Sequence, residues 1–259
     1  QVFSVEGQAI FPVNNTDIWR ILAILNSSPF QELINHISGQ HKSHGYVNSA
    51  HFNIDDLPDC SEHAYTIWQT INEVDQHNET ACHFAVPHFL KYVDLTFESM
   101  MGSVVKDRSC ALAFAAETRQ TINKQISQAL DSTYEYNGGN TNIDHVQILF
   151  GAVNSPYLET SNLVSYCLGV PFGRWDIRYA TGEQPIPDLP DPFAPLPACP
   201  PGMLQGVDGL PLTASPPGYP IEIQWDGVLV DDESHPADVV GRVRQVIELL
   251  WGDRAAAIE

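Results

Sequence analysis

The chain has 259 residues, 43% of them hydrophobic, and carries a formal net charge of −20. This length is enough for one large domain or two small ones with packed cores. This charge excludes a protein whose entire surface binds nucleic acid, because an acidic surface repels phosphates. Nucleic acid could bind only where the few cations gather on one face.

Membrane and secretory signals are absent from the sequence. No apolar run is long enough to cross a bilayer, and no signal peptide is recognisable, so we expect a cytoplasmic protein with no membrane partner. Five widely spaced cysteines without a Cys-x-x-Cys motif favour a reducing compartment over a disulfide framework or zinc finger. The chain begins at Gln1 and ends inside a predicted helix, so we expect a piece of a longer protein.

Helical periodicity dominates the first two thirds of the chain. Residues 16–38 are predicted to form two short helices, the second starting near Ser28-Pro29, and residues 108–132 one long helix. In the first short helix the expected apolar stripe is Ile18, Ile21, Leu22 and Leu25. In the long helix the residues expected to face inward are Ala115, Ile122, Ile126 and Leu130. Another helix is predicted from Ser61, and the apolar segment 80–103 is expected to kink at Pro87.

Proline accumulates in residues 184–220, which we expect to be extended chain because proline lacks a backbone donor. The alternation in "IEIQWDGVLV", residues 221–230, predicts a strand pair, and a helix is expected to start within His235–Asp238. The predicted fold class is therefore mainly α with a little β, a helical bundle-like region followed by a long Pro-rich extended segment.

Composition divides the chain into four expected segments. Residues 1–60 combine helices with a polar loop, and residues 61–183 are helical. Residues 184–232 are the Pro-rich acidic segment, and residues 233–259 begin a C-terminal helix.

"NSPY", residues 154–157, differs by one residue from the Asn-Pro-Pro-Tyr loop with which DNA amino methyltransferases hold a flipped base. No strand followed by a Gly-rich turn precedes it, so a site for S-adenosylmethionine is not expected in this chain. The favoured interpretation is a helix start, with Ser155 as cap and Pro156 as first helical residue. Leu163, Val164, Cys167 and Leu168 would then face inward. No catalytic residue is expected.

A metal site is also not expected. His41 and His44 have the spacing of half a site, but no second pair of ligands stands out nearby. A surface loop with two histidines is the favoured interpretation.

Two arginines bracket Trp175 in "FGRWDIR", residues 172–178, of a chain poor in arginine. One interpretation is a nucleic-acid contact through Arg174 and Arg178. The other is that Trp175 is a core residue and the arginines pair with acids such as Asp176 or Glu183. Composition alone favours the second, because acids are in surplus.

Several segments resemble large bacterial adenine-specific DNA methyltransferases of phage defence, namely the methylases of BREX and DISARM systems and their type II restriction-modification relatives. The resemblance spans nearly the whole chain, including "CLGVPFGRWDIRYATGE" from Cys167, and its most specific segments are "FGRWD" and "WDGVLVDD", which start at Phe172 and Trp225. The other similar segments are "GQAIFPVNNTDIWRILAILNSSPFQELI", "IDDLP", "INKQISQALDSTYEYNGGNTNID" and "DPFAPLPACPPGML".

The resemblance implies a target-recognition region that holds double-stranded DNA for a methyltransferase domain in cis, with S-adenosylmethionine bound by that domain in the parent enzyme. Other subunits of a defence system are further implied partners. Arg174 and Arg178 are the expected contacts to the DNA backbone. The polar loop expected to face a DNA groove contains Lys42, Ser43, His44, Tyr46 and Asn48.

An alternative function is an acidic interaction or assembly module that docks on a basic partner without touching DNA. Its cue is that no Lys or Arg occurs between Arg178 and Arg242. The cations that could meet DNA are Arg20, Lys42, Lys91, Lys106, Arg108, Arg119, Lys124, Arg174 and Arg178.

Overall fold

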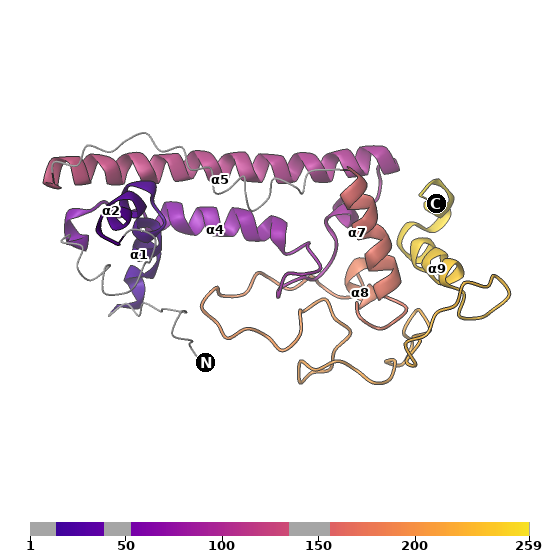
Figure 1. Cartoon of the computed structure of the whole chain (residues 1–259). Helices are drawn as coiled ribbons and strands as arrows, with labels where there is room; N and C mark the ends of the chain where they lie inside the picture. The colour runs from indigo at the N-terminus through magenta and orange to yellow at the C-terminus, as the bar shows by residue number, and fades with distance from the viewer. Residues whose placement is uncertain (1–13, 39–52, 135–155, 259) are drawn as a thin grey trace. The chain divides into compact units, whose positions relative to one another are not determined.

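The computed structural model describes residues 14–38, 53–134 and 156–258, and over these residues the chain is mainly α-helical with very little β structure, as the sequence predicts (Figure 1). The α-helices are α1 (Ile18–Leu25), α2 (Ser28–Ser38), α4 (Ser61–Asp75), α5 (Phe97–Tyr134), α7 (Pro156–Gly169), α8 (Ile177–Ala180) and α9 (Val239–Trp251). Short 3-10 helices are η1 (Asn15–Asp17), η2 (Ile54–Asp56), η3 (His88–Tyr92) and η4 (Gly252–Ala257). Within the described ranges, none of the helices has both the length and the apolar character needed to cross a membrane.

Helix α5 begins eleven residues earlier than predicted. The hydroxyl of Thr96 accepts a hydrogen bond from the backbone N–H of Ser99 at 3.4 Å, which is the interaction of an N-terminal cap. Pro87 does not kink a helix but precedes η3. The predicted inward face of α5 is confirmed, because Ala115, Ile122, Ile126 and Leu130 are all buried.

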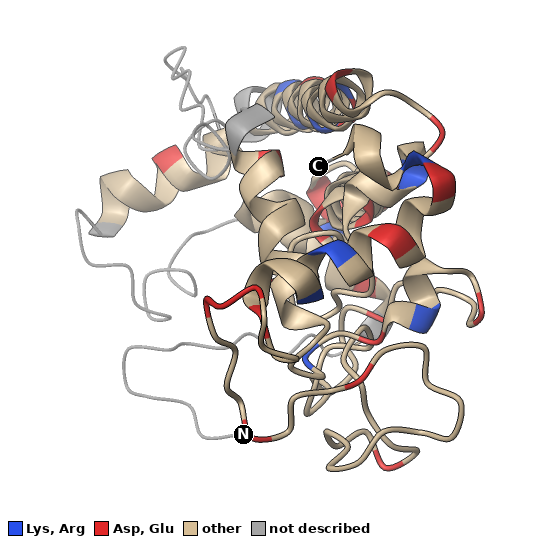
Figure 2. Cartoon of the chain, turned by 90° about the vertical axis from the view of Figure 1, so that its right-hand side faces the viewer, with Lys and Arg blue, Asp and Glu red and all other residues tan. Residues whose placement is uncertain are grey.

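Between α8 and α9 the chain contains no helix, and its only β pairing is two isolated bridges, Gln205 with Pro211 and Val230 with Asp238. The strand pair predicted for residues 221–230 is therefore wrong. Ile221 and Ile223 are nevertheless buried, so the alternation marks extended chain with one face packed inward. This stretch of sequence contains acidic residues but no Lys or Arg, although Glu222 pairs with Arg242 of α9 at 2.8 Å (Figure 2).

Helix α9 starts at Val239, later than predicted, because Asp238 is its N-cap. The Asp238 carboxylate accepts a hydrogen bond from the backbone N–H of Gly241 at 2.7 Å.

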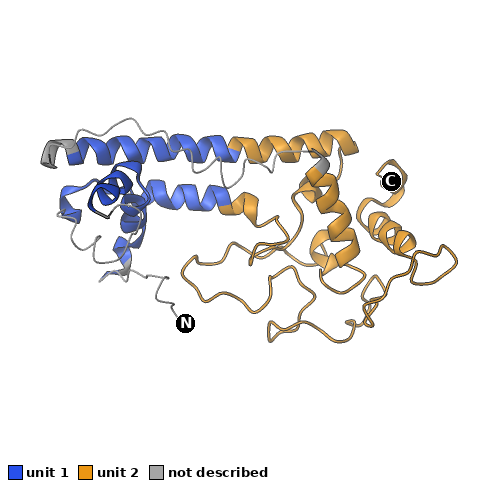
Figure 3. Cartoon of the chain, viewed as in Figure 1, with its two compact units in different colours: residues 1–71, 111–149 blue, residues 72–110, 150–259 orange. Residues whose placement is uncertain are grey.

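The chain divides into two compact units (Figure 3). Unit 1 comprises residues 1–71 and 111–149, and unit 2 comprises residues 72–110 and 150–259. Helices α4 and α5 contribute to both units. Each unit is assembled from two separate parts of the chain. The division into four segments that composition suggests stays a prediction.

Unit 1 has a small core around helices α1, α2 and the second part of α5. Its buried residues are Ala23, Ile24, Phe30, Ile34, Leu57, Cys60, Ile122, Ile126 and Leu130. The stripe predicted for α1 is wrong in register, because Ala23 and Ile24 are buried whereas Leu22 is exposed. Arg20 secures this core by donating to the carbonyl oxygens of Ile54 at 2.7 Å and Leu57 at 2.5 Å.

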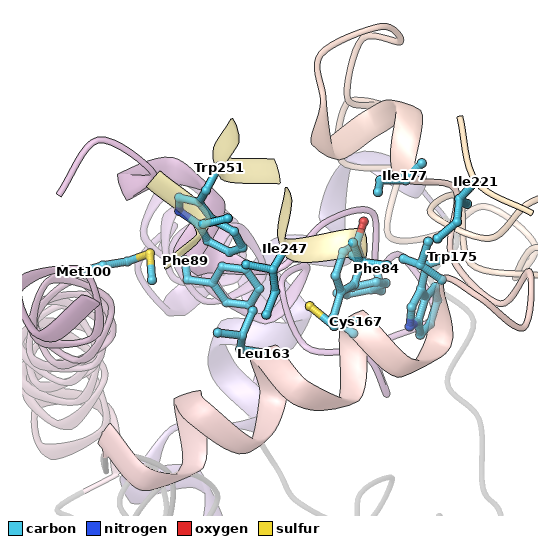
Figure 4. Close-up of a cluster of buried hydrophobic side chains, with 14 of the residues drawn as sticks. Phe84, Phe89, Met100, Leu163, Cys167, Trp175, Ile177, Ile221, Ile247 and Trp251 are labelled. Atoms are coloured by element: carbon cyan, nitrogen blue, oxygen red, sulfur yellow. The ribbon is translucent and has the colours of Figure 1, made fainter. Parts of the chain in front are cut away.

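Unit 2 has a larger core that joins the first part of α5, α7, α9 and the irregular chain. Figure 4 shows its aromatic centre, where Phe84, Phe89, Trp175 and Trp251 lie among aliphatic side chains. On α7, Leu163 and Cys167 are buried as predicted, but Val164 is exposed. The irregular segments supply Leu204, Ile221 and Ile223, so they form part of this core.

Candidate nucleic-acid interface

Several residues singled out in the sequence lie outside the described residues. These are Lys42, Ser43, His44, Tyr46 and Asn48 of the polar loop, and His41. Asn154 and Ser155 of the "NSPY" motif are outside them as well. Pro156 is the first residue of α7, which confirms the interpretation of this motif as a helix start.

The segment that joins α7 to α8, residues 170–176, contains Arg174 of "FGRWDIR", and most of its residues have a packing role. A Cβ atom on Gly169 would lie 2.5 Å from Cδ1 of Trp175, so only glycine allows the indole to lie against the end of α7. Trp175 is 1% exposed, and its ring centroid lies 4.4 Å from that of Phe84. Gly173 has a φ of 70°, the left-handed conformation that glycine adopts most readily.

Arg178 is engaged by the protein itself. Asp176, which is 3% exposed, is the N-cap of α8 and accepts a hydrogen bond from the backbone N–H of Arg178 at 3.1 Å. Its carboxylate also binds the guanidinium, with 2.7 Å between Nη2 and Oδ2, and this hydrogen bond raises the pKa of Arg178. The ion pair with Asp176 is thus confirmed. A contact of Arg178 with DNA stays a prediction, and it would compete with this pair.

Arg174 differs from Arg178 in its surroundings. Its side chain is exposed, and its guanidinium carbon lies 4.7 Å from the centroid of the Trp175 ring. It makes no ion pair within 4 Å with any residue that the structure describes. Stacking on a buried indole orients the guanidinium. Arg174 also interacts electrostatically with the carboxylate of Glu79, with which an anionic ligand would compete.

The other cations of the described ranges also divide into those that are bound by protein groups and those that have no ion pair to a described residue. Lys91 pairs with Asp107 at 2.9 Å and Arg108 with Glu159, and Arg20 is bound to carbonyl groups. The cations that could meet DNA and have no ion pair to a described residue are Lys106, Arg119, Lys124 and Arg174.

Two segments about fifty residues apart in sequence meet beside Arg174. The backbone N–H of Gln224 donates to the carbonyl oxygen of Pro171 at 2.8 Å. A Cβ atom on Gly173 would lie 3.6 Å from the ring of Trp225, so this ring packs against the turn. Phe172 is 39% exposed and Trp225 44% exposed. We call the exposed residues Phe172, Arg174 and Trp225 the signature surface.

Sequence reasoning identified Arg174 but missed Phe172 and Trp225. Both residues could have been found from the sequence, because each belongs to one of the two segments in which the resemblance is most specific. An exposed cation can bind a phosphate while exposed aromatic rings contact sugars or bases.

A second polar cluster in unit 2 surrounds Asp107. The Asp107 carboxylate accepts hydrogen bonds from His88 Nε2 at 3.1 Å, from Lys91 at 2.9 Å and from the Tyr92 hydroxyl. Burial alone would raise its pKa, but these hydrogen bonds lower the pKa of Asp107 to about 2. The His88 ring stacks near that of His77, with centroids 4.8 Å apart. Over the described residues, no group of three or more His, Cys, Asp or Glu side chains is placed to hold a metal ion.

From this cluster we predict that the free energy of unfolding decreases as the pH is lowered. Burial lowers the pKa of His77 from 6.5 to about 4, and burial also lowers the pKa of His88. The folded chain therefore takes up fewer protons at these imidazoles than the unfolded chain does below about pH 6.5. We expect the free energy of unfolding to fall by on the order of 2 kcal/mol between pH 6.5 and pH 4, measured by urea unfolding at several pH values.

The matched variants are His77→Gln and His36→Gln, since His36 is an exposed histidine of α2. Replacing His77 should flatten this pH dependence, and replacing His36 should leave it unchanged. An equal dependence in both variants would contradict the assignment to the buried pair.

Comparisons of the chain with models of protein families, with curated proteins and with solved structures find no match.

Proposed function

We propose that the chain is the DNA target-recognition part of an S-adenosylmethionine-dependent, adenine-specific DNA methyltransferase of restriction-modification or phage defence, with the catalytic domain elsewhere in the same protein. The observation that carries the proposal is the meeting of the two most specific segments of the resemblance. They are far apart in sequence, but the hydrogen bond from Gln224 to Pro171 joins the residues that directly precede them, and the ring of Trp225 packs against Gly173. Together they expose Phe172, Arg174 and Trp225.

Within this region, buried residues support the backbone, and other, exposed residues are the ones that would contact DNA. Gly169, Trp175 and Asp176 form a rigid base within the core of unit 2, and Phe172, Arg174 and Trp225 extend from it into solvent. A side chain held by such a base loses little conformational entropy on binding. The signature surface would position the duplex against the catalytic domain while an adenine turns out of the helix.

The net charge of −20 limits how much of the binding energy this chain can supply. Among the residues that the structure describes, few of the cations that could meet DNA lack an ion pair, so we expect a small number of phosphate contacts and a shallow dependence on salt. Basic surfaces of the rest of the enzyme would supply the remaining contacts.

The proposal predicts the effect of Arg174→Ala. Loss of one phosphate contact should weaken binding of duplex DNA to a similar extent for all sequences and reduce the slope of log affinity against log salt by about one. The measurement is fluorescence anisotropy of a labelled duplex at a series of low salt concentrations.

The control is Lys106→Ala, which removes an exposed and unpaired cation of unit 2 outside the signature surface. It should leave both affinity and slope nearly unchanged. Equal losses in the two variants would mean that only the total charge matters, and the signature surface would be rejected.

A second candidate function is an acidic interaction module that docks on a basic partner. The irregular chain between α8 and α9 favours it, because this stretch has no Lys or Arg and exposes apolar side chains. These exposed residues are Ile186, Phe193, Leu196, Val207, Leu210, Trp225 and Val228. If the unaltered chain binds no duplex DNA even at low salt, this function becomes the better explanation.

A further inference from the structure

Unit 1 contains an apolar cavity of about 250 Å³ between α1, α4 and α5. Its walls are formed by Trp19, Ala23, Ala64, Trp68, Arg119 and Ile122 among others. Ligand pockets for larger organic molecules enclose about 300–1,000 Å³, so this cavity has the size for a single small ring system. The resemblance assigned no role to it.

Aromatic rings gather on one side of the cavity. The ring centroids of Trp19 and Trp68 lie 5.7 Å apart, and Tyr65 lies 5.2 Å from Trp19 and 5.7 Å from Trp68. Tyr65 is 43% exposed, so the cluster reaches the surface. Rings fixed by one another in this way offer a rigid face on which a planar ligand can stack.

Arg119 of α5 supplies the only charged side chain among the described residues that line the cavity. It forms no ion pair with any residue of the described ranges, although the chain carries a surplus of acids. An unpaired cation beside an apolar cavity matches a ligand that combines a flat ring with a negative charge. A purely aliphatic occupant would leave the guanidinium without a partner.

We propose that this cavity binds one unpaired nucleotide of a DNA strand, with its base stacked on the tryptophan rings and a neighbouring phosphate bound to Arg119. The choice of DNA rests on the proposed function, because a recognition region that assists base extrusion meets nucleotides released from pairing. Stacking tolerates any base, so the cavity detects the absence of pairing and not the sequence.

The test compares three labelled DNAs with the 259-residue chain: a perfect duplex, the same duplex with one unpaired nucleotide, and that duplex with an abasic site at the unpaired position. Anisotropy gives affinity, and quenching of tryptophan fluorescence reports stacking. We expect the unpaired nucleotide to raise affinity on the order of 10-fold and to quench fluorescence, and we expect the abasic site to abolish both effects.

Variants locate the site. Arg119→Gln should remove most of this gain and reduce the salt slope by about one. Ala64→Leu fills the cavity without removing any polar group, so it should remove the gain and the quenching while leaving α4 folded. Lys124→Gln is the matched control, because Lys124 is an exposed, unpaired cation of the same helix that does not line the cavity. Circular dichroism checks that each variant keeps its helices.

The outcomes separate this inference from the proposed function. If Arg174→Ala weakens duplex binding but Arg119→Gln and Ala64→Leu do not alter the gain from the unpaired nucleotide, the cavity proposal fails and the signature surface stands. If Arg119→Gln and Ala64→Leu act as expected while Arg174→Ala has no effect, the reverse holds. Free nucleoside monophosphates that bind as tightly as the bulged duplex would overturn the assignment to DNA.

Discussion

Replacing Glu159 by alanine is expected to lower the free energy of unfolding by about 3–5 kcal/mol. Glu159 of α7 pairs with Arg108 of α5, and the two side chains are 3% and 7% exposed. Removing the carboxylate leaves a buried guanidinium without its counter-charge, which costs more than the intact pair contributes. Urea unfolding followed by tryptophan fluorescence measures the loss, since Trp175 and Trp251 report on the same unit.

Two companion variants test the cause. The double replacement Arg108→Met with Glu159→Leu removes both charges and should recover much of the stability, because an apolar pair of similar volume fits the buried site. Asp94 pairs with Arg254 at 3.9 Å and is fully exposed, so Asp94→Ala should cause no measurable loss. A loss from Glu159→Ala no larger than that from Asp94→Ala would refute the buried pair.

Replacing Trp175 by alanine is expected to cost about 3–5 kcal/mol in unfolding free energy. Trp175 is among the largest fully buried side chains, and it packs on Phe84 and against the end of α7 at Gly169. The variant leaves a cavity that the rigid turn around Gly173 cannot close. Thermal unfolding by calorimetry measures the change as a lower melting temperature.

Trp225→Ala is the matched control, because it removes the same side chain from a position in unit 2 that is 44% exposed. Trp225→Ala should lower the free energy of unfolding much less than Trp175→Ala does. It should nevertheless weaken DNA binding by more than this small loss of stability could explain. Gly169→Ala supplies an independent check, since the added methyl group would collide with the indole. That collision should disappear in the Trp175→Ala background.

Sequence periodicity predicts the fold where a long helix buries one face. The inward residues of α5, from Ala115 to Leu130, follow from the 3.6-residue repeat and are all buried. The same method gave the wrong register for the shorter α1, where Leu22 is exposed. Eight residues contain too few turns to define a stripe. The packing of Ala23 and Ile24 in one core with residues of α2 and α5 decides which side of α1 is buried.

The alternation in residues 221–230 predicts extended chain, and the burial of Ile221 and Ile223 agrees with it. It does not predict a strand, because a strand needs hydrogen bonds from a neighbouring strand, and tertiary structure provides only the isolated bridge at Val230. The alternation of side chains is a property of the local sequence, whereas the pairing of strands also depends on a second segment of the chain.

The sequence by itself determined the mainly α class and the helix start at Pro156, and it favoured the core position of Trp175 that the structure shows. It could not distinguish Arg174 from Arg178, which are the same residue type and lie only four positions apart. Only the tertiary structure shows that Asp176 caps α8 and binds Arg178, while Arg174 stacks on a buried indole and stays unpaired among the described residues. The physical reason is that an ion pair depends on where the backbone places two side chains, and that placement is decided by the packing of Trp175 against Gly169 and Phe84.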